Sequence, residues 1–367
     1  MERFFNTAGP QTPDSYTIDP LSRFDLEDIL LMIRQQRYFV MHAPRQTGKT
    51  SCMLALRDYL NKKGDYIAVY ANVEGGQASR NDKETVVKST IDTLTGAYRL
   101  VFKNDKADLA RNAVQGLSVD SMLSQYLSLL CQSLEKPLVL IIDEIDALVG
   151  DSLVSILRQI RSGYADRPKA FPQTIILCGV RDVRDYRIVL SNQDIVTGGS
   201  AFNIKATSLR LGNFSKEEIH ELYLQHTQET GQQFDEACFP MVWDATEGQP
   251  WLVNALAHEV TWNIRENRDR SVHIIPEMID KAIENIIYRR DTHINHILKL
   301  LNEPNVQKVI LPVYLNQENI DPSISIEDYD NCVENGIINR ERGKPLRIAN
   351  GIYKKLISNL NFDTKTT

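Results

Sequence analysis

Up to about Ser215, the chain alternates short apolar runs with segments whose apolar residues have helical spacing. The runs are rich in β-branched and aromatic residues, which favour strands. Strands that alternate with helices are typical of a parallel sheet covered by helices on both faces, so the pattern predicts a doubly wound α/β fold. The five expected strands lie at Tyr38–Met41, Tyr66–Tyr70, Leu138–Ile142, Ile175–Cys178 and Leu209–Leu211.

The pattern changes after this point. Ser215-Lys-Glu-Glu218 has the Ser-x-x-Glu form of a helix capping box, and apolar residues then keep helical spacing to about Ile287. This predicts a small helical lid domain. Beyond Asp291, two more helical patterns precede residues 336–348, which predict two short strands around a turn, and a last helix follows. Helices combined with such a ribbon predict a winged helix.

The first 25 residues contain three prolines, so this segment is expected to wrap the surface without forming an element of its own. The length of 367 residues suits two or three domains. The patterns predict an α/β domain at residues 1–205, a helical lid at 206–290, a winged helix at 291–360 and a frayed tail at 361–367.

A phosphate-binding loop is predicted where the first strand gives way to a helix, in the stretch APRQTGKTS. The pattern for such a loop is Gly, four residues, then Gly-Lys-Ser/Thr. Ala43 stands where the first Gly is expected, a mild departure because most contacts to phosphate come from backbone N–H groups at the helix N-terminus. The residues predicted to bind nucleotide here are Ala43, Pro44, Arg45, Gln46, Thr47, Gly48, Lys49, Thr50 and Ser51.

Three of these residues carry the chemistry of the loop. Gly48 lets the backbone approach the phosphates without a Cβ. Lys49 places an ammonium on the β- and γ-phosphates, and the Thr50 hydroxyl is suited to bind Mg²⁺. The loop therefore predicts ATP and Mg²⁺ as cofactors.

The apolar strand Leu138–Ile142 ends abruptly in acidic residues, Asp143-Glu144-Ile-Asp146. A strand inside a parallel sheet delivers its C-terminal residues to the ligand crevice. Asp143 is thus expected to hold Mg²⁺ through water, and Glu144 to activate the attacking water. A kinase has little use for a second acid, so Glu144 favours ATP hydrolysis. Asp146 is open to three roles, as a helix cap, a solvated residue or a catalytic acid.

Another apolar strand ends in Gly-Val-Arg181-Asp182. Arg181 is expected to reach the γ-phosphate, because a fork of donors beside the phosphates reports whether that group is present. The alternative is a surface ion pair with Asp182 or Asp185. Further candidates for contacts within the chain or from a neighbouring subunit are Arg158, Arg161, Arg184 and Arg187.

Together with Gly248-Gln-Pro-Trp251 in the helical region, these motifs resemble the AAA-like ATPases of bacteria and archaea, close to the STAND class of signalling NTPases. The resemblance covers nearly the whole chain. It implies that Gly248 and Pro250 approach the nucleotide, that Arg181 acts as the sensor arginine, and that the segment near Tyr16–Arg23 lies beside the adenine.

The chain departs from plant and animal members of that class in two ways. Where those members have a Met-His-Asp motif after the wing, this chain has Ile348-Ala349-Asn350, so the histidine that senses ADP is missing. Neither C-terminal repeats nor an N-terminal effector domain are expected. We therefore expect a bare switch module whose input and output come from a protein partner or from homo-oligomerisation.

Composition narrows the class of partner. The chain is 42% hydrophobic and 25% charged, which is sufficient for packed cores, and its net charge of −6 gives no general attraction to nucleic acid. Five cysteines without a Cys-x-x-Cys pair indicate neither a disulfide framework nor a zinc ribbon. No apolar run reaches the roughly 18 residues that span a bilayer, and no signal peptide is indicated. A cytoplasmic protein is expected.

DNA is a possible partner that the charges do not favour. The predicted recognition helix, Ser325–Asn335, carries four acidic residues and no Lys or Arg. We therefore expect a slowly hydrolysing Mg²⁺-ATP switch; the alternatives are a DNA-acting ATPase, in loading, transposition or defence, and a nucleotide-bound scaffold without turnover. A DNA contact led by the wing and last helix would use Arg340, Arg342, Lys344, Arg347, Lys354 and Lys355.

Overall fold

The computed structural model describes residues 2–79, 81–182, 187–190, 194–202, 205–316, 324–341 and 343–360. The chain forms two compact units. We call the first the sheet unit, which comprises Pro20–Ala43 and Lys49–Leu211. The second, called the helical unit, comprises Met1–Asp19, Pro44–Gly48 and Gly212–Thr367.

The sheet unit contains a parallel sheet of five strands in the order β4-β5-β6-β3-β9. All five strands were predicted, and the doubly wound α/β fold is confirmed. Because β6 lies between β3 and β5, the carboxyl ends of these three strands are adjacent at one edge of the sheet. The strands are β3 (Tyr38–His42), β4 (Ile67–Asn72), β5 (Leu138–Asp143), β6 (Thr174–Gly179) and β9 (Lys205–Arg210).

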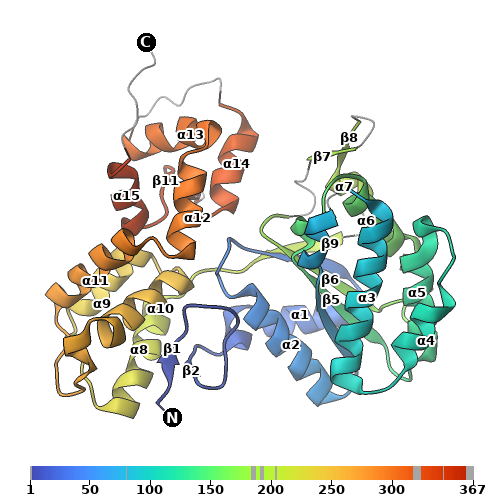
Figure 1. The fold of residues 1–367 in the computed structure, drawn as a ribbon, viewed down its shortest axis with the longest axis horizontal. Helices are drawn as coiled ribbons and strands as arrows, with labels where there is room; N and C mark the ends of the chain where they lie inside the picture. The colour runs from blue at the N-terminus through green and yellow to red at the C-terminus, as the bar shows by residue number, and fades with distance from the viewer. Residues whose placement is uncertain are drawn as a thin grey trace. The chain divides into compact units, whose positions relative to one another are not determined.

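The two faces of the sheet are both covered by helices (Figure 1). Along β5, Leu138, Leu140 and Ile142 pack into the core under α3–α6, whereas Val139 and Ile141 pack into the core under α1 and α2. Burial on both faces explains why this strand is apolar at every position. The helices are α1 (Leu26–Arg34), α2 (Lys49–Lys63), α3 (Lys83–Phe102), α4 (Lys106–Ala113), α5 (Val119–Ser133) and α6 (Gly150–Ser162).

Smaller elements complete the sheet unit. The antiparallel pair β7 (Arg187–Val189) and β8 (Ile195–Thr197) precedes the short helix α7 (Gly198–Ala201), and the sequence patterns did not predict this pair. Single 3₁₀ turns occur at Pro20–Arg23, Glu74–Ser79, Ile145–Ala147 and Tyr164–Asp166.

The helical unit begins its main run of helices with the predicted capping box. The Ser215 hydroxyl accepts a hydrogen bond from the Glu218 N–H at 3.1 Å, and the Glu218 carboxylate accepts one from the Ser215 N–H at 2.7 Å. The helices are α8 (Lys216–Thr230), α9 (Cys238–Thr246), α10 (Pro250–His258), which continues into a π turn (Glu259–Asn263) and a 3₁₀ turn (Arg265–Arg268), and α11 (Pro276–Arg289).

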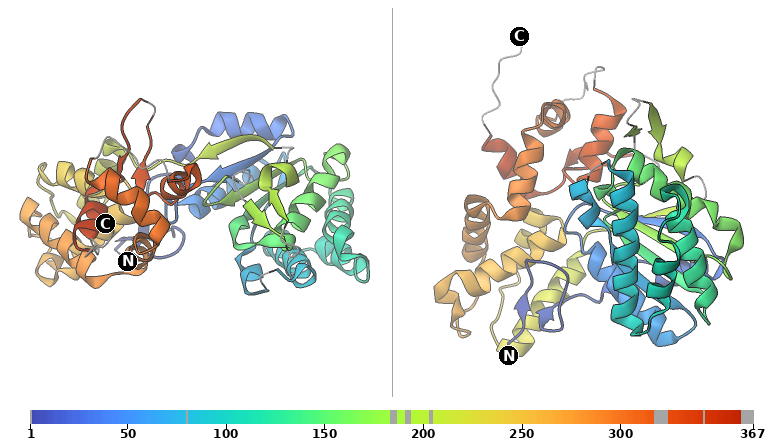
Figure 2. Two further views of the ribbon diagram at one scale, coloured as in Figure 1. Left: turned by 90° about the horizontal axis from the view of Figure 1, so that it is seen from above. Right: turned by 45° about the vertical axis from the view of Figure 1, so that its right-hand side comes forward.

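Beyond Asp291, the predicted ribbon and last helix are present, but three helices precede the ribbon where two helical patterns were predicted. Three helices precede a two-stranded antiparallel ribbon, and one helix follows it; the left view of Figure 2 shows the ribbon beside these helices. All of them share one apolar core with α8–α11. The elements are α12 (Thr292–Leu301), α13 (Pro304–Tyr314), α14 (Ile326–Glu334), β10 (Ile338–Asn339), β11 (Arg347–Ile348) and α15 (Gly351–Ser358).

The division into units differs from the predicted domains in several places, since Pro44–Gly48 belongs to the helical unit and that unit includes both the predicted lid and the predicted winged helix. Strand β9 runs to Arg210, so the sheet unit extends beyond residue 205. The N-terminal segment, with the parallel pair β1 (Phe4–Phe5) and β2 (Ser15–Tyr16), belongs to the helical unit. Its aromatic rings provide the reason, because Tyr16 is fully buried beside Phe5 and its hydroxyl lies 3.3 Å from Nδ1 of His226.

Within the described residues, no helix combines the length and apolar character needed to cross a membrane. The five cysteines are buried free thiols.

Candidate functional site

The predicted phosphate-binding loop connects β3 to α2. Gln46 and Gly48 both have a positive φ, at +60° and +92°, which bends the loop back toward the start of α2. Ala43 is fully buried and has a negative φ, and its N–H donates to the Gly179 carbonyl at 3.3 Å. The position where Gly was expected therefore tolerates a Cβ, and Ala43 ties the loop to the end of β6.

Lys49 is the first residue of α2, and its side chain is buried. Its ammonium donates to the Ala43 carbonyl at 2.8 Å. Burial lowers the pKa of Lys49, and the carboxylates of Glu144 and Asp143 oppose that shift. The loop thus holds a cation at a helix N-terminus, which is the arrangement that favours phosphate.

Asp143, the last residue of β5, is fully buried and accepts three hydrogen bonds. Its Oδ2 accepts from the Thr50 hydroxyl at 2.8 Å and from the Tyr70 hydroxyl at 2.7 Å, and its Oδ1 accepts from the Glu144 N–H at 2.9 Å. The two residues predicted as metal ligands, Thr50 and Asp143, are therefore in direct contact. Hydroxyl and carboxylate oxygens are the ligands that Mg²⁺ prefers, so the pair fits this ion.

Tyr70 contacts the site although no sequence motif identified it. It lies on β4 opposite Ile141 of β5, and Asn72, two residues later, lies opposite Asp143. Side chains two residues apart share a face of the sheet. This relation depends on the register of β4 against β5, which no local sequence pattern encodes.

Glu144 has a backbone conformation that is unusual for a residue with a side chain. Its φ is +57°, a conformation that costs of order 1–3 kcal/mol and is concentrated at functional sites. Burial raises the pKa of Glu144, and the charges of Asp143 and Asp146 raise it further, whereas Lys49 lowers it. A carboxylate with a raised pKa is suited to accept a proton near neutral pH.

Asp146 connects the acidic loop to the next strand. Its Oδ2 accepts a hydrogen bond from the Val180 N–H at 3.2 Å, one residue beyond the end of β6. A Cβ at Gly179 would lie 2.7 Å from Asp146 Oδ1, so a glycine is required for this approach. This contact favours a positioning role for Asp146 over the helix cap and the solvated residue considered from the sequence.

Arg181 follows directly and is half-buried, at the sheet edge that also carries Asp143. Among the other candidate arginines, Arg158 and Arg161 are exposed on α6. Arg184 lies outside the described residues, as does the side chain of Arg187.

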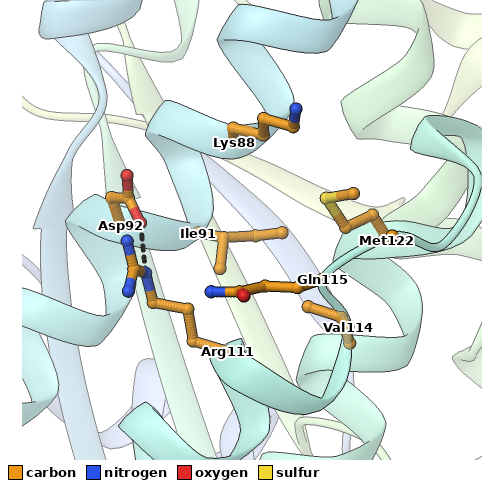
Figure 3. A pocket seen from close by; sticks show the side chains of 8 residues that line it. Lys88, Ile91, Asp92, Arg111, Val114, Gln115 and Met122 are labelled. Atoms are coloured by element: carbon orange, nitrogen blue, oxygen red, sulfur yellow. Dashed lines mark hydrogen bonds and ion pairs between the residues drawn. The ribbon is translucent and has the colours of Figure 1, made fainter.

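Among the hollows in the described part of the sheet unit, two differ in their relation to the candidate site. One, of about 770 Å³, opens beside the acidic loop and is lined by Glu74, Asp146 and Val149 among others. The other, of about 290 Å³, lies among α3, α4 and α5 (Figure 3). It has an apolar floor and a rim that includes the Arg111–Asp92 ion pair. Since no residue of the loop or of the acidic motif lines it, the second hollow is separate from the candidate site.

In the helical unit, the predicted pair Gly248 and Pro250 flanks a residue that the sequence analysis omitted. Gly248 packs on Phe214, whose N–H donates to the Gly248 carbonyl at 2.8 Å, and Pro250 is buried at the first position of α10. Between them, the Gln249 carboxamide caps α10 and donates to the Gln46 carbonyl at 3.3 Å. Contact with the phosphate-binding loop is therefore made by Gln249.

A lysine-bearing loop at a helix N-terminus and a buried aspartate beside it, at one edge of a parallel sheet, define a P-loop NTPase. A comparison with protein families matches residues 26–354 to the AAA-like domain. The chain therefore belongs to the AAA-like domain family, which confirms that part of the predicted resemblance. Closeness to the STAND class stays a prediction.

Solved structures with this fold include two archaeal proteins. The Walker-type ATPase of Pyrococcus abyssi is 15% identical, with a TM-score of 0.59 over 96% of this chain and 99% of that one. Cdc6p from Pyrobaculum aerophilum is 17% identical, with a TM-score of 0.51 over 95% of each chain. A comparison with curated proteins gave no match.

Gly248→Ala distinguishes a backbone role from a nucleotide contact. Gly248 has a φ of +73°, and an added Cβ would lie 1.9 Å from the Phe214 carbonyl oxygen, so we expect a loss of about 1–3 kcal/mol in the free energy of unfolding. Gly212→Ala is the matched control, because a Cβ there meets no atom within 4 Å. Denaturant unfolding without nucleotide measures both variants. Equal stability, with ATP affinity lost only in Gly248→Ala, would favour the nucleotide contact instead.

Proposed function

We propose that this AAA-like protein binds Mg²⁺-ATP at loop 43–51, hydrolyses it slowly, and uses the difference between ATP and ADP as a molecular switch. The observation that carries the proposal is the 2.8 Å hydrogen bond between Thr50 and Asp143. It joins the phosphate-binding loop to the acidic strand end, the two halves that ATP hydrolysis requires.

The proposed roles follow the chemistry of each side chain. Thr50 and Asp143 would hold Mg²⁺, which when bound neutralises charge on the phosphates. Lys49 binds the β- and γ-phosphates. Glu144 accepts a proton from water as the water oxygen bonds to the γ-phosphorus and the bond to the bridging oxygen breaks. Arg181 donates to the γ-phosphate and thereby distinguishes ATP from ADP.

The switch would act through the turn between α9 and α10. Gln249 contacts the Gln46 carbonyl of the loop. Two residues earlier, Glu247 accepts a bidentate pair of hydrogen bonds from Arg347 of β11, at 2.6 and 2.8 Å. The sequence patterns placed the lid at residues 206–290; because β9 belongs to the sheet unit, we assign residues 212–290 as the lid and 291–360 as the winged helix. A conformational change in the loop on ATP hydrolysis would then shift the winged helix through this short turn. The shifted winged helix would in turn change binding to a protein partner or to a second copy of the chain.

The charges around β10 and β11 support this switch over the DNA-acting alternative. Arg340 pairs with Asp330 at 2.5 Å, Lys344 pairs with Glu341 at 2.5 Å, and Arg347 pairs with Glu247. Arg342 lies outside the described residues. Cations that already pair with carboxylates release fewer counterions from DNA, so they add less affinity.

Lys49→Ala is expected to abolish ATP binding, because it removes the cation at the loop. Lys62→Ala, an exposed change near the other end of α2, is the control and should bind ATP normally. Isothermal calorimetry of ATP binding with Mg²⁺ measures both variants. Wild-type affinity in Lys49→Ala would rule out the proposed site.

Glu144→Gln is expected to retain ATP and to lower turnover by about 10²–10⁴-fold, the usual contribution of a general base. Because the pKa of Glu144 is raised above its ordinary value of 4.5, wild-type turnover should fall as the pH drops through that raised pKa. Phosphate release under single-turnover conditions from pH 5 to 8 checks both points. Undiminished hydrolysis would assign the base to another residue.

The same variant has a predicted effect on stability. A raised pKa means that the folded protein binds the Glu144 proton more tightly than the unfolded chain does, so the charged carboxylate destabilises the fold at pH values above its pKa. Glu144→Gln should therefore melt at a higher temperature than wild type at pH 8. The difference in melting temperature between the variant and wild type should narrow as the pH is lowered toward 4.5, the ordinary pKa of a glutamate.

Any DNA affinity is expected to be weak and strongly salt-dependent, with no complex that survives physiological salt, with or without ATP. Joint neutralisation of Arg340, Arg342 and Lys344 should leave ATPase activity intact. Electrophoretic mobility shifts over a salt series and ATPase assays with duplex DNA are the measurements. ATPase activity that duplex DNA stimulates, and that the triple variant loses, would favour the DNA-acting alternative.

A further inference from the structure

Tyr70 reaches the candidate metal site from a strand that carries none of the predicted site residues. Its ring packs against the core under α1 and α2, which includes Met53 and Leu56 of α2. Its hydroxyl extends past the ring and donates to Asp143 Oδ2 at 2.7 Å. Packing of the Tyr70 ring therefore positions its hydroxyl for the hydrogen bond to the Asp143 carboxylate.

The three hydrogen bonds to Asp143 have different consequences for a bound metal. Thr50 donates its hydroxyl hydrogen to Oδ2, and its oxygen lone pairs would remain available to a metal, so this bond is compatible with ligation but comes from a residue that would itself hold the ion. The Glu144 N–H belongs to the next residue and holds Oδ1 locally. The Tyr70 hydroxyl holds Oδ2 from β4, a separate element whose residues are not predicted ligands.

We propose that Tyr70 is a positioning residue for the magnesium site, whose hydroxyl orients the Asp143 carboxylate so that Asp143 and Thr50 act on one ion. This inference rests on the proposed Mg²⁺-ATP function. An ordinary phenol is protonated at physiological pH, so the Tyr70 hydroxyl acts as a donor to Asp143. Partners that orient a ligand in this way typically contribute 10–100-fold to metal affinity.

Tyr70→Phe removes the hydroxyl and keeps the ring, so it separates positioning from packing. Tyr66→Phe is the matched control, because Tyr66 packs against the same core just before the start of β4, at the opposite end from Asp143. In the full-length protein, binding of a fluorescent ATP analogue in EDTA gives the nucleotide affinity without magnesium. A titration with Mg²⁺ then gives the magnesium midpoint, which is the concentration that produces half of the Mg²⁺-dependent increase in binding.

We expect Tyr70→Phe to raise that magnesium midpoint about 10–100-fold and to leave affinity in EDTA unchanged. Tyr66→Phe should match wild type in both measurements. An unchanged midpoint in Tyr70→Phe, with a clear magnesium dependence in wild type, would overturn the role of Tyr70 and leave the proposed function standing. Wild-type binding without magnesium dependence would overturn both.

A double-mutant cycle with Asp143→Asn tests the route of the effect. If Tyr70 acts through the Asp143 carboxylate, the double variant should have a magnesium midpoint close to that of Asp143→Asn alone. Independent, multiplicative effects would show that the hydroxyl acts by another route and would overturn the assignment.

Discussion

A buried carboxylate at the end of β5 constrains the arrangement around the site. Asp143 has no exposed surface, and an ionised group in such a position is very costly unless hydrogen bonds compensate for lost water. The compensating donors come from three parts of the fold, namely Thr50 on α2, Tyr70 on β4 and the N–H of Glu144. The buried Asp143 carboxylate is therefore compensated only when β4 pairs with β5 in this register and the start of α2 lies beside the end of β5.

Backbone contacts set the spacing across the same sheet edge. The Ala43 N–H donates to Gly179 at the end of β6, and Asp146 accepts from the Val180 N–H one residue later. Both contacts require β6 to lie between β3 and β5, which the strand order provides. The start of the loop, the acidic motif and Arg181 are consequently positioned by neighbouring strand ends. Ala43 has a negative φ, so its Cβ causes no backbone strain at the position where a glycine was expected.

Features with a local cause were predictable from the sequence, and features with a tertiary cause were not. The five strands of the parallel sheet follow from short apolar runs, the start of α8 from the Ser215 capping box, and the loop and acids from their spacing. Tyr70 and Gln249 escaped prediction because their partners depend on strand register and on packing between distant segments. The N-terminal segment was also misplaced, since proline content indicates an irregular chain but not the helices that bury Tyr16.

The turn at residues 247–249 makes two weak contacts, one with β11 and one with the phosphate-binding loop. Gly248 packs closely on the backbone of Phe214, whose N–H donates to the Gly248 carbonyl at 2.8 Å. The Glu247–Arg347 pair on one side is partly exposed, with 25% and 39% of the two side chains accessible, and exposed pairs contribute about 0–1 kcal/mol. The Gln249 contact on the other side is a single 3.3 Å hydrogen bond. A turn held at Gly248 and flanked by two weak contacts is consistent with the proposed switch, because either contact can break at a cost that differential binding of ATP and ADP can supply.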